Sequence, residues 1–164
     1  CIAISLAKNL PNANVFALDV SKGALNMAKE NATLNEVNVT FIETDILNNE
    51  DWKAFVNDQK FDIIVSNPPY VRHLEKTEMK NNVLNNEPQL ALFVDDDNPL
   101  LFYKSITEFA LTHLNKEGEL YFEINQYLGQ EMVELLEDFK FKSIELKKDI
   151  FGNNRMIKAI VNPH

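Results

Sequence analysis

Cysteine is almost absent from this sequence of 164 residues, in which Cys1 is the only one. No disulfide can form within the chain, so a reducing compartment such as the cytoplasm is the expected location. The sequence also lacks an apolar run of the roughly 20 residues that a membrane-spanning helix needs. Its opening segment has neither the basic flank nor the cleavage site of a signal peptide. We therefore expect no membrane partner.

Basic residues are in deficit. Lys and Arg number 16 against 25 Asp and Glu, which gives a formal net charge of -9 and a pI near 4.8. Tight binding of nucleic acid usually needs a clustered basic surface that displaces counterions, so nucleic acid is not the leading expectation as a partner. The three histidines are scattered, and with one cysteine no metal site is predicted.

What is present is typical of a soluble globular protein, with 45% hydrophobic and 25% charged residues. The length suits one compact domain, and we predict a single catalytic domain over residues 1–164. The chain begins with Cys1 inside an apolar periodic segment, where a native chain would begin with Met. This start predicts that the domain is truncated at its N-terminus.

Short apolar runs alternate with segments of helical periodicity, the pattern of right-handed βαβ crossovers and a mainly parallel sheet covered on both faces. The short turn at Gly152-Asn153-Asn154 predicts a closing antiparallel hairpin. The polar stretch 71–98 is expected to be a long functional loop with room for one short helix. Helices are predicted at 1–10, 22–35 with Ser21 as N-cap, 50–57, 99–115 and 127–138, and strands at 14–20, 39–45, 61–66, 119–124, 142–150 and 155–161.

Polar residues end three of the predicted strands, namely Asp19, Asp45 and Asn67. Ligands of open parallel sheets bind at the carboxyl ends of the strands, so we expect these three residues to face one crevice. A carboxylate at Asp19 is placed to accept hydrogen bonds from both hydroxyls of a ribose. Each acid has an alternative interpretation as the cap of the next helix, and for Asp45 the two interpretations start level.

The segment Asn67-Pro68-Pro69-Tyr70 directly follows a predicted buried strand. Two prolines remove two backbone donors and fix two φ angles, so the segment forms a rigid corner. We expect the Asn67 side-chain oxygen and the Pro68 carbonyl to accept the two N–H groups of a planar nitrogen, with Tyr70 against its flat face. Such acceptors orient the nitrogen for attack on a methyl sulfonium carbon. The alternative is a structural turn with an aromatic side chain packed beneath it.

With Asp19 and Asp45 upstream, the segment Phe61 to Tyr70 resembles class I methyltransferases that modify planar nitrogens. More closely, the chain resembles the HemK/PrmC family of protein-(glutamine-N5) methyltransferases, which act on peptide chain release factors. The likeness covers nearly the whole chain. It is carried by CIAISLA, ALDVS, NPPYV, Glu87-Pro88 with Ala91-Leu92, Phe122-Glu123-Ile124, and Asp149 to Gly152 with Arg155.

This resemblance implies an α/β, Rossmann-like fold with an antiparallel C-terminal strand, S-adenosyl-L-methionine as cofactor and a release factor as protein substrate. It assigns Asp19 to the ribose and Asp45 and Ile46 to the adenine region. Asn67, Pro68, Pro69 and Tyr70 are assigned to the target glutamine amide, with Asn67 also near the cofactor and Asn67, Pro68 and Tyr70 catalytic. In the family a glycine-rich cofactor loop precedes the segment that begins here at Cys1, so we expect this chain itself to be impaired.

Other residues near the strand ends receive weaker interpretations. Core and capping roles suffice for Glu123 and Asn125, and a solvated loop position is at least as good for Glu87 as a role in the cleft. Around Val94 to Pro99 the sequence departs from the family's usual pattern, so Asp95, Asp96 and Asp97 are given no role.

Two alternative functions remain open. Adenine-N6 methylation of DNA or RNA keeps the chemistry, because an exocyclic amine presents the same planar NH2 group. That activity predicts a basic path and usually a separate recognition domain, and neither is visible in the sequence. The other alternative is an inactive fragment of such an enzyme.

Overall fold

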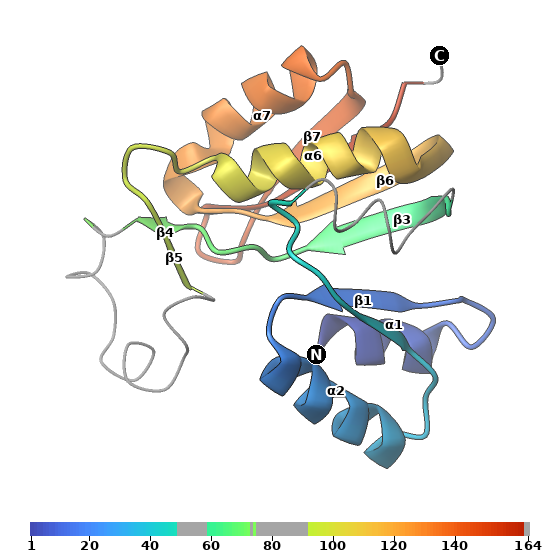
Figure 1. The fold of residues 1–164 in the computed structure, drawn as a ribbon. Coiled ribbons are helices and arrows are strands. Elements are labelled where there is room, and N and C mark those ends of the chain that lie inside the picture. Colours follow the sequence, from blue (N-terminus) through green and yellow to red (C-terminus); the bar gives the residue numbers. More distant parts are fainter. Residues whose placement is uncertain (49–58, 73, 75–91, 163–164) are drawn as a thin grey trace. The chain divides into compact units, whose positions relative to one another are not determined.

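The computed structural model describes residues 1–48, 59–72, 74 and 92–162. The chain divides into two compact units, Cys1–Asn57 and Asp58–His164, and each is described by itself (Figure 1). The predicted helix 50–57 and Glu87 lie outside the described residues. The described part contains no helix long and apolar enough to cross a membrane.

The first unit alternates helix and strand as the sequence predicts. It runs through α1 (Ile2–Asn9), β1 (Phe16–Asp19), α2 (Lys22–Leu34) and β2 (Thr40–Glu43). β1 and β2 pair in parallel, with Asp19 opposite Glu43. The predicted N-cap is confirmed, because the Ser21 hydroxyl accepts a hydrogen bond from the Ala24 amide at 3.2 Å.

The second unit is built on a four-stranded mixed sheet with the order β3-β6-β8-β7. Its strands are β3 (Phe61–Ser66), β6 (Leu114–Glu123), β7 (Lys142–Lys148) and β8 (Asn154–Ile160). β3 pairs with β6 in parallel, whereas β8 pairs with both β6 and β7 antiparallel. The closing hairpin is thus confirmed, and Gly152 takes the positive φ of +86° that its turn requires.

Two helices, α6 (Leu101–His113) and α7 (Gly129–Asp138), contact this sheet and each other (Figure 1). The strand register places Leu120 opposite Ala159 and Phe122 opposite Ile157, and all four are buried. The face with these residues, together with Tyr103 and Ile106 of α6 and Met132 and Leu136 of α7, forms the core. The opposite face carries Tyr121 and Lys158, so the two helices of this unit lie on one face of its sheet. The predicted cover on both faces of the whole sheet stays a prediction.

The polar stretch 71–98, predicted as a long functional loop with room for one short helix, contains two short strands that the sequence did not predict. Its two described ends form the short strands β4 (Val71–Arg72) and β5 (Phe93–Val94), which pair in parallel. Val94 is buried. This pairing joins the residues that follow Tyr70 to those that precede α6.

Candidate functional site

The corner Asn67-Pro68-Pro69-Tyr70 begins directly after β3, as predicted. Because Ser66 pairs with Phe122, the strand register brings the corner beside the end of β6, where Glu123 is the last residue. Asn67 is exposed, Pro68 is buried, and Pro69 and Tyr70 are half-buried. The side chain of Asn67 is therefore available to a ligand. The buried Pro68 that follows it restricts movement of the backbone at this point.

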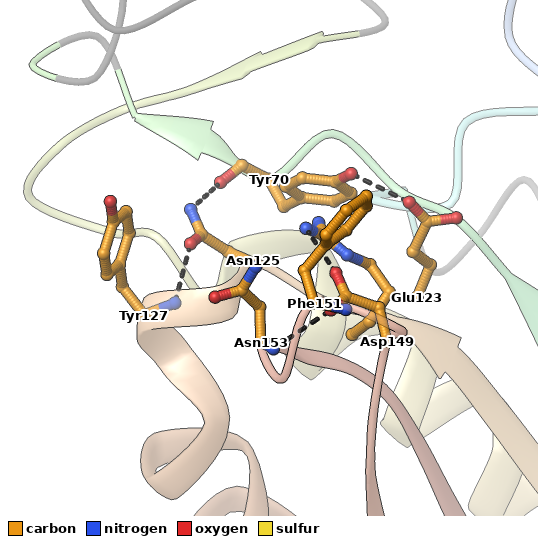
Figure 2. A network of polar contacts seen from close by, with 8 residues as sticks. Tyr70, Glu123, Asn125, Tyr127, Asp149, Phe151 and Asn153 are labelled. Carbon is orange, nitrogen blue, oxygen red and sulfur yellow. Dashed lines mark hydrogen bonds and ion pairs between the residues drawn. The ribbon is translucent and has the colours of Figure 1, made fainter.

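Tyr70 is held at two points (Figure 2). Its hydroxyl donates a hydrogen bond to Glu123 Oε1 at 2.9 Å, and its carbonyl accepts one from Asn125 Nδ2 at 3.0 Å. Burial raises the pKa of Tyr70 to about 12, and the negative charge and hydrogen bond of Glu123 act in the same direction, whereas Arg155 opposes them. Tyr70 is therefore a neutral, fixed aromatic ring and not a proton-transfer group near pH 7.

Asn125 links the corner to the next element of the chain. Its side-chain oxygen accepts a hydrogen bond from the Tyr127 amide at 3.0 Å and caps the short helix η2 (Gln126–Leu128). The predicted capping role is thus confirmed, and the contact with Tyr70 is an additional role that the sequence did not reveal. Asn125 is buried, so both of its polar atoms gain from being bonded.

Glu123 also has a role beyond the core position predicted for it. Besides its side-chain bond to Tyr70, its backbone carbonyl accepts the hydroxyl of the buried Tyr103 at 3.2 Å. Burial also raises the pKa of Tyr103, so its hydroxyl remains a donor. The only sequence signal for this role was the position of Glu123 at a strand end.

Asp149 and Arg155 form the base of the hairpin between β7 and β8. Arg155 Nη2 lies 3.4 Å from Asp149 Oδ2, and this ion pair together with two backbone hydrogen bonds lowers the pKa of Asp149 against the opposing effect of burial. The Arg155 carbonyl accepts the Ile124 amide at 2.9 Å. The hairpin is thereby tied to the residue between Glu123 and Asn125.

The two acids of the first unit lie at one end of the β1–β2 pair. Asp19 Oδ1 accepts the Ser21 amide at 2.8 Å, and Asp45 Oδ1 accepts the Leu47 amide at 2.9 Å. Each carboxylate thus closes a local turn and leaves its second oxygen for a ligand. For Asp19 the alternative interpretation as a helix cap is wrong, because Ser21 caps α2. For Asp45 that alternative stays untested, because the helix predicted at 50–57 lies outside the described residues. The prediction that Asp19 and Asp45 share a crevice with Asn67, which is in the other unit, stays a prediction.

Thr44 and Ile46 flank Asp45. Ile46 is half-buried. Thr44 is buried, and its hydroxyl has no hydrogen-bond partner among the residues that the structure describes. The groups that this strand end offers to a ligand are the second oxygens of the Asp19 and Asp45 carboxylates, which accept hydrogen bonds.

The aspartates that follow β5 form a short exposed run. Asp95, Asp96 and Asp97 are exposed, and Asp96 Oδ1 accepts the Leu74 amide at 3.1 Å. Within the described ranges no group of His, Cys, Asp or Glu side chains is arranged to hold a metal ion.

Comparison with known proteins places this geometry in a family. The family model described as methyltransferase small domain matches residues 1–92, a stretch that includes Asp19, Asp45 and the whole corner. The chain belongs to this methyltransferase family.

Curated relatives extend the similarity beyond residue 92 of this methyltransferase domain. The release factor glutamine methyltransferase of Flavobacterium psychrophilum is 65% identical over 159 residues, which are 97% of this chain and 54% of the relative. The protein of the same name from Bacteroides thetaiotaomicron is 47% identical over 97% of this chain and 56% of its own length. The resemblance drawn from the sequence is confirmed, and the chain spans about half the length of these curated relatives.

Solved structures confirm the class I methyltransferase fold predicted for this domain. A methyltransferase from Pyrococcus furiosus superposes with a TM-score of 0.66 at 17% identity, over 97% of this chain and 68% of the other. A ribosomal protein L11 methylase from Lactobacillus delbrueckii subsp. bulgaricus gives a TM-score of 0.62 at 23% identity, over 99% and 64%. At these identities the likeness concerns the fold alone.

Proposed function

We propose that this chain supplies the methyl-acceptor site of an enzyme that transfers a methyl group from S-adenosylmethionine to the N5 atom of a glutamine in a peptide chain release factor. The observation that carries the proposal is the corner after β3, whose Tyr70 is fixed at both its hydroxyl and its carbonyl. The relative at 65% identity bears the name of this activity, which supports the choice of substrate.

The corner suits a glutamine amide because it presents acceptors for both N–H groups. Asn67 is exposed and offers its side-chain oxygen as one acceptor. The Pro68 carbonyl is the second acceptor, and neither proline of the corner has a backbone N–H group that could bond to it. The Tyr70 ring, neutral and held by Glu123, would lie against the flat amide group. Two acceptors and a fixed ring orient the nitrogen lone pair, which is the main task when reactants must be aligned.

S-adenosylmethionine, when bound, supplies a methyl carbon on cationic sulfur, so the new N–C bond forms as the C–S bond breaks and yields a neutral thioether and one proton. The proton leaves from the methylated nitrogen to solvent after the bond is made. A strong base is not needed, because an amide nitrogen that still carries the extra proton after methylation is very acidic and gives that proton to water. Tyr70, which stays protonated near pH 7, does not take it.

Asp19, Asp45 and Ile46 would hold the nucleoside part of the cofactor, with Asp19 on the ribose and Asp45 and Ile46 beside the adenine. The second oxygens of the two carboxylates, which make no hydrogen bond within the described residues, support this assignment. We propose that residues 1–164 act as one catalytic domain and that Asn67 also lies near the cofactor. A cytoplasmic location follows from the proposed substrate, which works in translation.

A methyl-transfer assay tests the proposal. Labelled S-adenosylmethionine is supplied to the intact protein with release factor, DNA and RNA in parallel, and label on a release-factor glutamine is the expected result. Asn67→Ala should lower transfer by roughly 100-fold or more, the usual loss when one oriented polar group is removed from a reaction site. Asn38→Ala, which changes an exposed Asn just before β2, at the end of that strand opposite to Asp45, serves as the matched control.

Each other outcome has a defined meaning. Label on adenine in DNA or RNA that is lost in Asn67→Ala would keep the chemistry of the corner and overturn the substrate. Equal labelling of the release factor by the wild type and Asn67→Ala would overturn the role of the corner. Asp19→Ala should raise the KM for S-adenosylmethionine and leave the KM for the release factor unchanged, which separates the two sites.

A further inference from the structure

The tip of the hairpin between β7 and β8 exposes two large apolar side chains next to each other. Ile150 is 93% exposed and Phe151 is 81% exposed. Single exposed apolar residues are common and need no explanation. A neighbouring pair at one projecting tip is different, because both side chains remain in water where an ordinary turn carries polar residues.

This exposure does not come from a loosely held turn. Asp149 Oδ1 accepts the amides of Phe151 and Asn153 at 2.9 and 3.0 Å, and the Asp149 amide donates to the Asn153 carbonyl at 2.8 Å. The Gly152 amide donates to the Asp149 carbonyl at 3.0 Å, and Arg155 pairs with the same carboxylate. Such a turn holds its apolar side chains outward, and it loses little conformational entropy when a partner binds because it is already ordered.

The tip belongs to the same structural network as the corner. Arg155, just after the turn, accepts the Ile124 amide through its carbonyl, and the two neighbours of Ile124 are Glu123 and Asn125, which hold Tyr70. Figure 2 shows Phe151, Asp149 and Asn153 of the hairpin in the same close view as Tyr70, Glu123 and Asn125. A molecule whose reacting group lies at the corner therefore has its flanking parts within reach of the tip.

The charges around the tip favour a protein over a nucleic acid. The tip residues Ile150 to Asn153 carry no charge. The cations next to them in the sequence are Lys147, Lys148 and Arg155, and two of these three are paired, Lys147 with Glu145 and Arg155 with Asp149. Nucleic-acid backbones are bound mainly by free Lys and Arg side chains. Exposed Ile and Phe side chains instead bind apolar side chains of another polypeptide.

We propose that Ile150 and Phe151 form a docking point for the segment of the protein substrate that flanks the target glutamine. The proposal rests on the proposed function and adds the surface that selects a polypeptide as its substrate. Docking of the flanking segment stabilises the bound substrate and the transition state equally. Loss of this contact therefore raises the KM for the release factor and leaves kcat unchanged.

The test compares the intact wild-type protein with the double variant Ile150→Ser/Phe151→Ser, using release factor as the methyl acceptor. We expect the KM for the release factor to rise by roughly tenfold or more, as for a small interface hot spot, while kcat and the KM for S-adenosylmethionine stay within about twofold. Leu34→Ser/Met27→Ser, which removes two exposed apolar side chains of α2 (80% and 65% exposed), is the matched control and should leave every constant unchanged. The single variant Phe151→Leu should keep most of the affinity of the wild type for the release factor, because it retains an apolar side chain at this position.

The two levels of proposal fail in different ways. A wild-type protein that places no label on the release factor would overturn the proposed function. A wild-type protein that labels the release factor, with a double variant of unchanged KM, would overturn the docking point alone. A drop in kcat with unchanged KM would also overturn it, because the hairpin would then act only through the shape of the corner.

Discussion

At the scale of single residues, the candidate site depends on side chains that hold other side chains. Tyr70 is positioned by Glu123 and Asn125, which are 53 and 55 residues away in the sequence. Glu123 is in turn fixed through its backbone by Tyr103. The acceptors proposed for the substrate amide are therefore placed by a buried polar network, and such networks lose function when one member is removed.

Tyr70→Phe keeps the ring and removes only the hydrogen bond to Glu123. We expect methyl transfer by the intact protein to fall by roughly tenfold, because the ring is no longer held in one orientation. Tyr121→Phe removes a comparable bond, from the Tyr121 hydroxyl to Glu119 Oε2 at 2.6 Å, away from the corner. Its kcat should match that of the wild type, and equal losses in the two variants would show that the bond to Glu123 has no special role.

The pKa of Tyr70 gives a second prediction. Its pKa of about 12 in the folded state lies above the ordinary tyrosine value of 10.0, so its contribution to stability is fully present below pH 10. That contribution is lost as the pH rises from 10 towards 12. The free energy of unfolding of the wild type should therefore fall more steeply over this range than that of Tyr70→Phe, as measured by urea unfolding at several pH values; parallel curves would contradict the raised pKa.

At the scale of elements, most predicted helices and strands are found where the pattern places them, and the differences are informative. The strand expected at 119–124 begins already at Leu114, directly after α6. Its pairing with β3 shifts between Phe61 and Ile63, and Glu117 takes a positive φ of 62°. This irregularity lets the chain change from helix to strand without a separate loop.

Gly129 and Gly23, each in a helix, allow the effect of close packing on stability to be compared with the effect of helix propensity. A methyl group on Gly129, at the start of α7, would approach the Asn154 side chain and lie 3.2 Å from Leu146 Cδ2, whereas on Gly23 of α2 its nearest neighbour is Ser21 Oγ at 3.8 Å. We expect Gly129→Ala to lower the free energy of unfolding by about 1–3 kcal/mol. Gly23→Ala should raise it by roughly 0.5 kcal/mol, because alanine favours the helix. Urea unfolding followed by circular dichroism measures both, and a stabilising Gly129→Ala would contradict the close packing of α7 on the hairpin strands.

At the scale of the whole molecule, charge bears on the choice between protein and nucleic-acid substrates. The net charge of -9 repels a polyanion within roughly a Debye length of the surface, about 8 Å at physiological ionic strength and more at low salt. We expect this chain to show no binding to duplex DNA by fluorescence anisotropy even at low ionic strength. Binding that weakens steeply with added salt would contradict this and favour the adenine-methylating alternative.

The sequence by itself determined the local features of this protein. The alternating pattern predicted the strands and helices, Ser21 predicted a cap, Gly152 a hairpin turn, and the proline pair a rigid corner after β3. Each of these depends on residues within a few positions of one another, where propensity and backbone geometry act directly.

Only the tertiary structure showed what surrounds the corner. The bonds of Tyr70 to Glu123 and Asn125, and the tie between Arg155 and Ile124, depend on which strands are neighbours and in what register. Pairing between distant segments is decided by the packing of the whole sheet, and no local pattern encodes it. For this reason Glu123 and Asn125 looked like ordinary strand-end residues in the sequence and became the supports of the candidate site in the folded chain.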